Sequence, residues 1–278
     1  MGKVYDALRR AEEERGRQAT GAAAPTVPTA PPEAEGAGRP GRRKGRRGAA
    51  LTAPVPDEAL DANRRRIALL DPESFVTEQF RTLRARIEAL AAQRPIRTIL
   101  VTSALAGEGK STAALNLALV TAMELDRKVL LVECDLRRPE IHTSLGIAPR
   151  AGLAEVLLGE APLEEAVHPV EGTRLHVLPV RKLPPNPSEL LSSERMRKLA
   201  EELAHSYDTV IFDTPATLGL PDAKELSELM DGVVMVVRAD STPREDLEAA
   251  LDILDRRRIL GLVFNGAEVD VERYEYRD

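Results

Sequence analysis

A strand-like run, IRTILVTS, leads directly into a glycine-rich turn and then into a helical pattern, SALAGEGKSTAALNLALVTA. Ala104, four residues, and then Gly109, Lys110 and Ser111 form a Walker A loop in which Ala replaces the leading Gly. Gly107 and Gly109 let backbone N–H groups curl around phosphate oxygens, and the N-terminus of the following helix adds its positive end. The stretch therefore predicts a phosphate-binding loop between a buried strand and a helix.

This loop predicts that the chain binds the phosphates of a nucleotide together with Mg²⁺. We expect the Lys110 ammonium to reach the β- and γ-phosphates and the Ser111 hydroxyl to ligate Mg²⁺. The residues expected to contact the nucleotide are Gly107, Glu108, Gly109, Lys110, Ser111 and Thr112.

Short β-branched apolar runs alternate with helical patterns over most of the chain. The runs are 96–103, 128–134, 174–179, 207–213, 232–238 and 259–264. Nearly continuous apolar strands separated by helices are typical of a parallel sheet that is covered on both faces. We therefore expect one α/β domain of the P-loop NTPase class over residues 64–268, with a mostly parallel sheet.

The two ends of the chain differ from this domain. Residues 3–15 have an amphipathic helical pattern, so residues 1–18 are expected to form a short N-terminal helix. Residues 19–63 hold 7 of the 20 Pro, 6 of the 18 Gly and no aromatic residue, which predicts a flexible, disordered linker. Its basic run RPGRRKGRRG is either a solvated charge block or a segment attracted to an anionic membrane surface.

Bulk composition limits the class of function. The net charge of -6 argues against nucleic acid as a partner. A single cysteine, Cys134, excludes an internal disulfide and fits a reducing cytosol. No apolar run approaches the roughly 20 residues that span a bilayer, so we expect a cytoplasmic protein. The histidines show no metal-ligand spacing: His142, His168, His176 and His205.

Three carboxylates follow apolar runs. Asp213 ends VIFD in a Walker B arrangement, and Glu133 and Asp135 end LLVECD. Period two along a strand puts Glu133 and Asp135 on one side and Cys134 on the other, so Cys134 is expected to be a packed thiol. Because the carboxyl ends of parallel strands meet at one edge, these acids predict a Mg²⁺ site and a catalytic base beside the phosphates.

Together these motifs resemble the bacterial tyrosine kinases of the CpsD/CapB type, which act in capsule and exopolysaccharide production and belong to the MinD/ParA-like P-loop superfamily. PPNPSELLSSERM, LPDAKELSELMDGVVMVVRADST and LGLVFNGAE resemble the corresponding family stretches, and MGKVYDALRRAEEE resembles family N-termini. In EQFRTLR, the residues Glu78, Arg81 and Arg84 match the family's Glu-x-x-Arg-x-x-Arg motif, which is associated with ring-shaped self-assembly.

The resemblance implies a role for each motif residue. Lys110, Ser111 and Asp213 would serve ATP and Mg²⁺, with Asp135 near the metal. In the family's acidic-x-Asp-x-Arg motif, here ECDLR from Glu133 to Arg137, the first acid would help to deprotonate the tyrosine; that acid is Glu133, where the family usually has Asp. The extra methylene moves the carboxylate by about 1 Å, so we expect reduced turnover.

Asn265, at the end of the last strand, corresponds to the family's adenine-side Asn. Its alternative interpretation is a turn Asn before Gly266. The C-terminal tail, residues 269–278, would be the substrate: an autokinase is expected to phosphorylate Tyr274 and Tyr276 in trans between subunits.

The resemblance also implies partners: a transmembrane polysaccharide co-polymerase that activates the kinase, further copies of the chain in a ring, and a cognate tyrosine phosphatase. The kinase would be recruited to the inner face of the membrane through its partner. Two alternatives remain open. A positioning ATPase of the MinD/ParA kind would carry Lys where Leu105 stands, and a weakly active nucleotide-binding scaffold fits the Glu133 departure.

Overall fold

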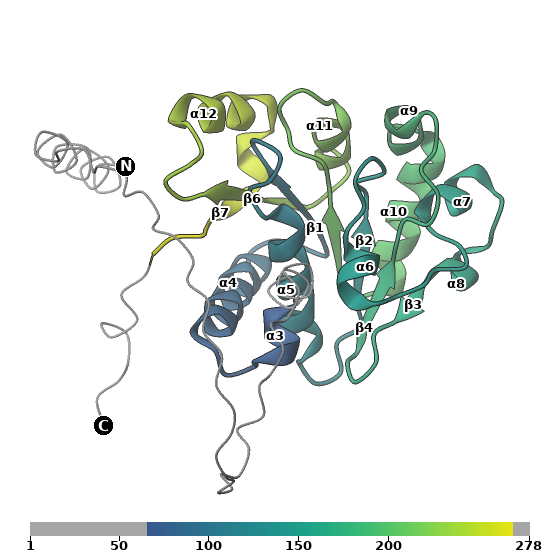
Figure 1. The fold of residues 1–278 in the computed structure, drawn as a ribbon, viewed down its shortest axis with the longest axis horizontal. Helices are drawn as coiled ribbons and strands as arrows, with labels where there is room; N and C mark the ends of the chain where they lie inside the picture. Colours follow the sequence, from purple (N-terminus) through teal and green to yellow (C-terminus); the bar gives the residue numbers. More distant parts are fainter. Residues whose placement is uncertain (1–65, 269–278) are drawn as a thin grey trace, which may run out of the picture. The chain divides into compact units, whose positions relative to one another are not determined.

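The computed structural model describes residues 66–268, so the expected N-terminal helix, the linker and the tail with Tyr274 and Tyr276 lie outside the described residues. Within residues 66–268 one seven-stranded sheet has the strand order β3-β4-β2-β5-β1-β6-β7 (Figure 1). The strands are β1 (Thr98–Ser103), β2 (Val129–Glu133), β3 (His168–Pro169), β4 (Leu175–Leu178), β5 (Thr209–Asp213), β6 (Gly232–Arg238) and β7 (Ile259–Asn265).

All six predicted strands are confirmed, and the sheet is parallel except at β3. Strand β3 was missed because it has only two residues, one of them Pro, and pairs antiparallel with β4. The register aligns the motif-bearing strand ends, because Asp213 of β5 lies opposite Val101 of β1 on one side and Glu133 of β2 on the other. The Walker A loop and the three carboxylates therefore share one sheet edge.

Helices cover both faces of the sheet, as predicted, and each face has its own apolar core. One core packs the sheet against α3 to α6, and the other packs it against α7 to α12 (Figure 1). The bounds are α3 (Ile67–Leu70), α4 (Phe75–Ala91), α5 (Lys110–Ala122), α6 (Ile141–Leu145), α7 (Leu153–Leu158), α8 (Leu163–Ala166), α9 (Pro187–Leu191), α10 (Glu194–Ser206), α11 (Asp222–Ser227), α12 (Arg244–Ile253) and the 3₁₀ turn η1 (Arg256–Arg258).

Helix α4 follows Asp71-Pro72. Ser74 is its N-cap, and the Ser74 hydroxyl accepts a hydrogen bond from the Thr77 N–H. Ile87 is buried against α5, so α4 shields the phosphate-loop helix from solvent.

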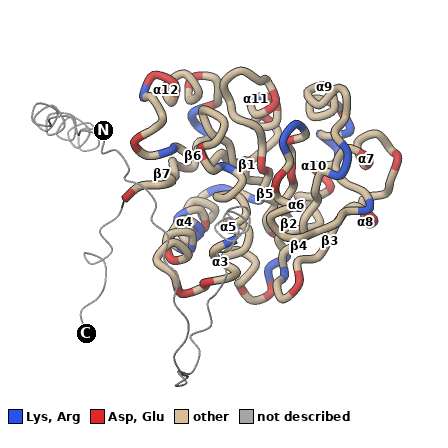
Figure 2. The backbone as a smooth tube through the Cα atoms, in the orientation of Figure 1, with Lys and Arg blue, Asp and Glu red and all other residues tan. Residues whose placement is uncertain are grey.

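Charge is spread over the described part of the chain. Figure 2 shows Lys and Arg segments interspersed with Asp and Glu segments along the helices and loops. Electrostatics at the site must therefore be judged from individual neighbours. Among residues 66–268, no helix has both the length and the apolar character needed to cross a membrane.

Candidate active site

The phosphate loop has the backbone shape that its glycines predict. Gly107 and Gly109 have φ of +84° and +92°, in the left-handed region that favours glycine. Gly109 is the N-cap of α5, and a Cβ there would lie 2.0 Å from Nδ2 of Asn265. Glycine is thus required at 109 both for its φ and for the close approach of β7.

Polar contacts hold the loop from two sides. The Glu108 carboxylate is buried and accepts hydrogen bonds from the Leu105 N–H, at 2.8 Å, and from the Thr242 hydroxyl. Asn265 donates its amide N–H to the Glu108 carbonyl at 2.9 Å. The structure therefore places Asn265 directly on the loop. Thr242 is a residue that sequence reasoning missed, since it lies 134 positions from Glu108 and belongs to no motif.

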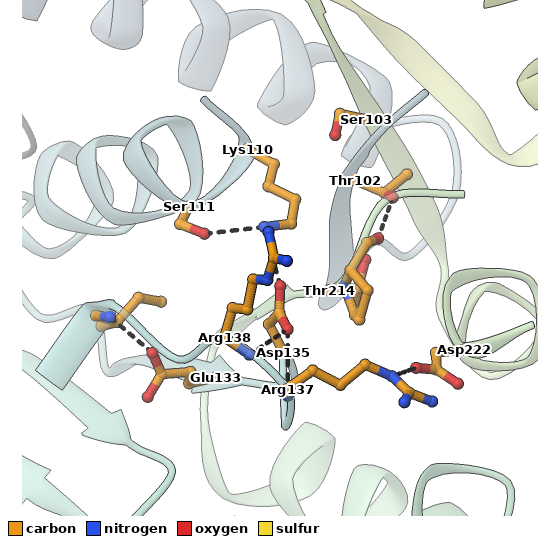
Figure 3. Close-up of polar contacts among 12 residues, drawn as sticks. Thr102, Ser103, Lys110, Ser111, Glu133, Asp135, Arg137, Arg138, Thr214 and Asp222 are labelled. Atoms are coloured by element: carbon orange, nitrogen blue, oxygen red, sulfur yellow. Dashed lines mark hydrogen bonds and ion pairs between the residues drawn. The ribbon is translucent and has the colours of Figure 1, made fainter. Parts of the chain in front are cut away.

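Lys110 pairs with an acid that follows β2. Its Nζ lies 3.1 Å from Asp135 Oδ2 and 3.4 Å from the Ser111 hydroxyl oxygen (Figure 3). Burial acts to lower the pKa of Lys110, but the charges of Asp213 and Asp135 outweigh burial and raise the pKa above its ordinary value. The ammonium is therefore a firmly charged group at the mouth of the loop.

Asp213 lies in an environment that disfavours its charged form. The side chain is buried, and burial raises its pKa to about 7 although Lys110 and a hydrogen bond from Ser111 act in the opposite direction. One carboxylate oxygen, Oδ1, has no hydrogen-bond partner. A buried oxygen without a partner beside a serine hydroxyl is the kind of donor set that a hard cation would satisfy.

The residues present fit Mg²⁺ better than a metal held by protein ligands alone. Among residues 66–268, no cluster of three or more His, Cys, Asp or Glu side chains is arranged to hold a metal. Mg²⁺ is usually held by one or two carboxylates together with phosphate oxygens and waters. Ser111, Asp213 and Asp135 supply such a partial set.

Glu133 differs sharply from Asp135. Its side chain is fully buried, and its two oxygens accept the Ile141 N–H at 2.6 Å and the Val180 N–H at 2.9 Å. Nδ1 of His142 lies 3.3 Å from one of these oxygens. In Figure 3, Glu133 points away from Lys110. The carboxylate thus joins the end of β2 to α6 and to the segment after β4.

Cys134 is the packed thiol that the sequence predicts. It is fully buried in the core on the face opposite Glu133. Burial, with the nearby charge of Asp213, raises the pKa of Cys134 well above its ordinary value, so it is not a reactive thiolate.

A cleft of ≈ 1000 Å³ opens above the loop. It brings together most of the predicted site residues: Gly107, Gly109, Lys110, Ser111, Thr112, Asp135 and Asn265. Arg137, Arg138 and Arg238 also line it. Asp213 is buried beneath this cleft, beside Ser111, and Glu133 is buried beside it.

The three residues of the predicted assembly motif on α4 have different surroundings. Glu78 and Arg81 form an ion pair on the surface. Arg84 turns inward, donates to the Val120 carbonyl at 2.8 Å and pairs with Glu124 at 3.1 Å. Arg84 is therefore engaged within its own chain.

Comparisons with known proteins agree with this geometry. A family model described as an AAA domain matches residues 96–256. The tyrosine-protein kinase YwqD of Bacillus subtilis (strain 168) is 42% identical over 73% of this chain and 86% of its own length. The succinoglycan biosynthesis transport protein ExoP of Rhizobium meliloti (strain 1021) is 32% identical over 80% of this chain but only 29% of its own length.

Solved structures give the same result. The chimerical protein CapA2B2 matches with a TM-score of 0.70 and 31% identity, over 74% of this chain and 91% of that one. The septum site-determining protein MinD of Pyrococcus horikoshii OT3, complexed with Mg-ADP, matches with a TM-score of 0.52 and 25% identity, over 60% and 69%. By sequence, fold and site, this chain belongs to the bacterial tyrosine-protein kinases, within the P-loop superfamily that includes MinD.

Proposed function

We propose that the kinase is an ATP- and Mg²⁺-dependent autokinase of exopolysaccharide or capsule production, and that it phosphorylates Tyr274 and Tyr276 of a neighbouring copy. The observation that carries the proposal is the arrangement of Lys110, Asp135 and Asp213 around Ser111 at one sheet edge. The family membership and the similarity to ExoP, named for succinoglycan biosynthesis, support the polysaccharide role.

In the proposed reaction, Lys110 exchanges its pairing with Asp135 for the β- and γ-phosphates of ATP. The tyrosine oxygen forms a bond to the γ-phosphorus, the bond from that phosphorus to the oxygen of the departing ADP breaks, and the tyrosine proton passes to a carboxylate. Ser111 and Asp213, with Asp135 near the metal, would hold Mg²⁺, which would supply neutralisation of the charge on the phosphates. A base is needed because the tyrosine hydroxyl has a pKa near 10.

The base assigned by family resemblance is Glu133, and Asp135 is the other candidate. Glu133 has no exposed surface, and both of its oxygens already accept backbone N–H groups. Asp135 lines the cleft, and its Oδ1 accepts the N–H groups of Arg137 and Arg138. Its Oδ2 is freed when Lys110 moves to the phosphates. These contacts favour Asp135 as the proton acceptor. They favour Glu133 as the residue that positions the turn carrying Asp135.

The proposed partners are a transmembrane polysaccharide co-polymerase, which would recruit the cytoplasmic kinase to the inner face of the membrane, a cognate tyrosine phosphatase, and a ring of further copies. The CapA2B2 match is to a chimera, which is consistent with a kinase that works with a second protein. A ring would bring the tail of one copy to the cleft of the next.

A MinD-like ATPase without kinase activity is the second candidate, and the MinD match with Mg-ADP favours it. Leu105 at the position where that class carries Lys argues against it. A weakly active nucleotide-binding scaffold is the third candidate.

The test is incubation of the purified full-length chain with Mg²⁺ and ATP, followed by mass mapping of phosphate. We expect phosphotyrosine at Tyr274 and Tyr276, and none in Lys110→Ala. The double variant Tyr274→Phe, Tyr276→Phe should keep nucleotide binding and lose the modification. ATP hydrolysis without phosphotyrosine would overturn the proposal in favour of the ATPase, and binding without hydrolysis would favour the scaffold.

A further inference from the structure

Two adjacent arginines follow Asp135, and their side chains have different surroundings. Arg137 is engaged in a polar cluster: its Nε lies 3.4 Å from Asp222 Oδ2, and its Nη2 donates to the Ser188 hydroxyl at 2.8 Å. Asp222 is fully buried, so Arg137 supplies the charge that this carboxylate needs. Arg137 therefore fixes the turn against α9 and α11.

Arg138 is fixed only through its backbone, whose N–H donates to Asp135 Oδ1 at 2.9 Å. Its side chain is exposed and lines the cleft with Lys110, toward which it extends in Figure 3. The guanidinium forms neither an ion pair nor a side-chain hydrogen bond with any residue of the range 66–268. A cation on a fixed turn beside the site thus remains available to a substrate.

The same wall of the cleft also carries negative charge. Asp135 and Glu140 line it, and both contribute to the raised pKa of Lys110. When Lys110 binds phosphates instead of Asp135, this wall would repel an acidic substrate unless another cation were present. Arg138 lies where it offsets that repulsion.

We propose that Arg138 selects acidic tyrosine-containing peptides by binding a carboxylate beside the acceptor tyrosine. The inference rests on the proposed kinase function and adds the substrate class. The last ten residues, VDVERYEYRD, hold four carboxylate side chains and two arginines, and Glu272 and Glu275 flank Tyr274. Arginine and carboxylate groups match in geometry as well as in charge.

Arg238 provides a matched control. It lines the same cleft from the end of β6, and its guanidinium lies close to Gly266. Gly266 directly follows Asn265, which contacts the phosphate loop. Arg238 is therefore expected to affect nucleotide binding, whereas Arg138 is expected to affect peptide binding.

The experiment uses full-length kinase carrying Tyr274→Phe and Tyr276→Phe, with a synthetic peptide of residues 269–278 as the substrate. A second peptide carries Glu272→Gln and Glu275→Gln. For the native peptide, Arg138→Gln should raise KM by about 3- to 10-fold, in the range of a partly exposed ion pair, and should change KM for ATP by less than about 2-fold. For the Gln peptide, Arg138→Gln should have no effect beyond about 2-fold.

Charge reversal sharpens the test. Arg138→Glu should lose the native peptide and regain activity on a peptide with Glu272→Lys and Glu275→Lys. Equal losses on both original peptides, or a raised KM for ATP in Arg138→Gln, would overturn the inference. If wild-type kinase phosphorylates the native and Gln peptides equally well, only this inference fails. If the chain makes no phosphotyrosine on its own tail or on any peptide, the proposed function fails with it.

Discussion

At the edge where the parallel strands begin, an aspartate accepts three hydrogen bonds on one carboxylate oxygen, whereas at the edge where they end Asp213 keeps a buried oxygen without a partner. Asp231 accepts hydrogen bonds from the Arg97 N–H, at 2.8 Å, and from the N–H and hydroxyl of Thr98, both at 2.9 Å. Asp213 has a pKa raised to about 7 and no hydrogen bond to Oδ1.

Several charged groups near α4 and β2 at the starting edge are also paired. Asp208 accepts the Lys128 N–H at 2.8 Å. Arg84 pairs with Glu124, and Arg127 pairs with Glu88 at 2.9 Å. These contacts are satisfied without any ligand.

The two edges differ in role: the groups at the starting edge stabilise the fold, whereas Asp213 serves the proposed reaction. Contacts within the protein stabilise the groups at the starting edge. Asp213 instead has a buried oxygen without a partner, which a bound cation would satisfy. A site prepared for a ligand commonly reduces the stability of the free protein. Substitutions at the two edges should therefore have opposite effects.

The largest effect is expected from Asp213→Asn, which should lower kcat/KM for tail phosphorylation by on the order of 10²–10³-fold, because Asp213 would hold the Mg²⁺ that neutralises the reacting phosphates. Phosphotyrosine formation at saturating Mg²⁺ and ATP measures this. Activity within 10-fold of wild type would show that Asp213 does not serve the reaction.

The same substitution should stabilise the free protein. A carboxyl whose folded pKa of about 7 exceeds its unfolded value of 3.8 loses stability as pH rises from about 4 to about 7, because the unfolded state ionises first. Asp213→Asn cannot ionise, so its free energy of unfolding relative to wild type should rise by about 1–3 kcal/mol between pH 5 and pH 8. Urea unfolding in EDTA without nucleotide measures it, and a flat difference would contradict the raised pKa.

The second comparison separates the two acids at the end of β2, Glu133 and Asp135. Asp135→Asn should lower kcat by about 100-fold, because it removes the proton acceptor in the cleft. Glu133→Gln should lower kcat by less than about 10-fold but destabilise the fold by about 1–3 kcal/mol, since one backbone N–H loses its acceptor. Single-turnover phosphorylation and urea unfolding give the two values. An equal loss of kcat in both variants would return the base to Glu133.

The sequence predicted the fold well and the site in part, for physical reasons. The glycines at 107 and 109 and the acid after VIF form local patterns that few folds share, so the phosphate loop and Asp213 could be found from them. Period two placed Glu133 on the side opposite Cys134, but β2 ends at Glu133 and the direction of its carboxylate depends on Val180, 47 residues away. The contact between Glu108 and Thr242 is equally non-local.

At the starting edge, Asp231→Ala should destabilise the protein by about 2 kcal/mol, because it leaves backbone N–H groups of Arg97 and Thr98 without an acceptor. Activity per folded molecule should stay within about 2-fold, since Asp231 lies at the opposite end of β1 from the loop. Urea unfolding and phosphorylation at 15 °C, normalised to folded protein, check both. A 10-fold loss of activity in Asp231→Ala would contradict the proposal that the starting edge serves stability and not the reaction.

The smallest effects are expected on α4, where the predicted assembly motif combines an outer pair with an inner residue. Arg84→Ala should destabilise the fold by about 1 kcal/mol, since Arg84 bonds to Val120 and Glu124 of its own chain. Glu78→Ala with Arg81→Ala should change stability by less than about 0.5 kcal/mol, because that pair is on the surface. Because Glu78→Ala with Arg81→Ala is expected to leave the fold intact, light scattering of this double variant tests ring assembly without a loss of stability. If the double variant keeps the wild-type size while Arg84→Ala alone reduces it, the loss reflects a weakened fold and the outer pair is not an interface.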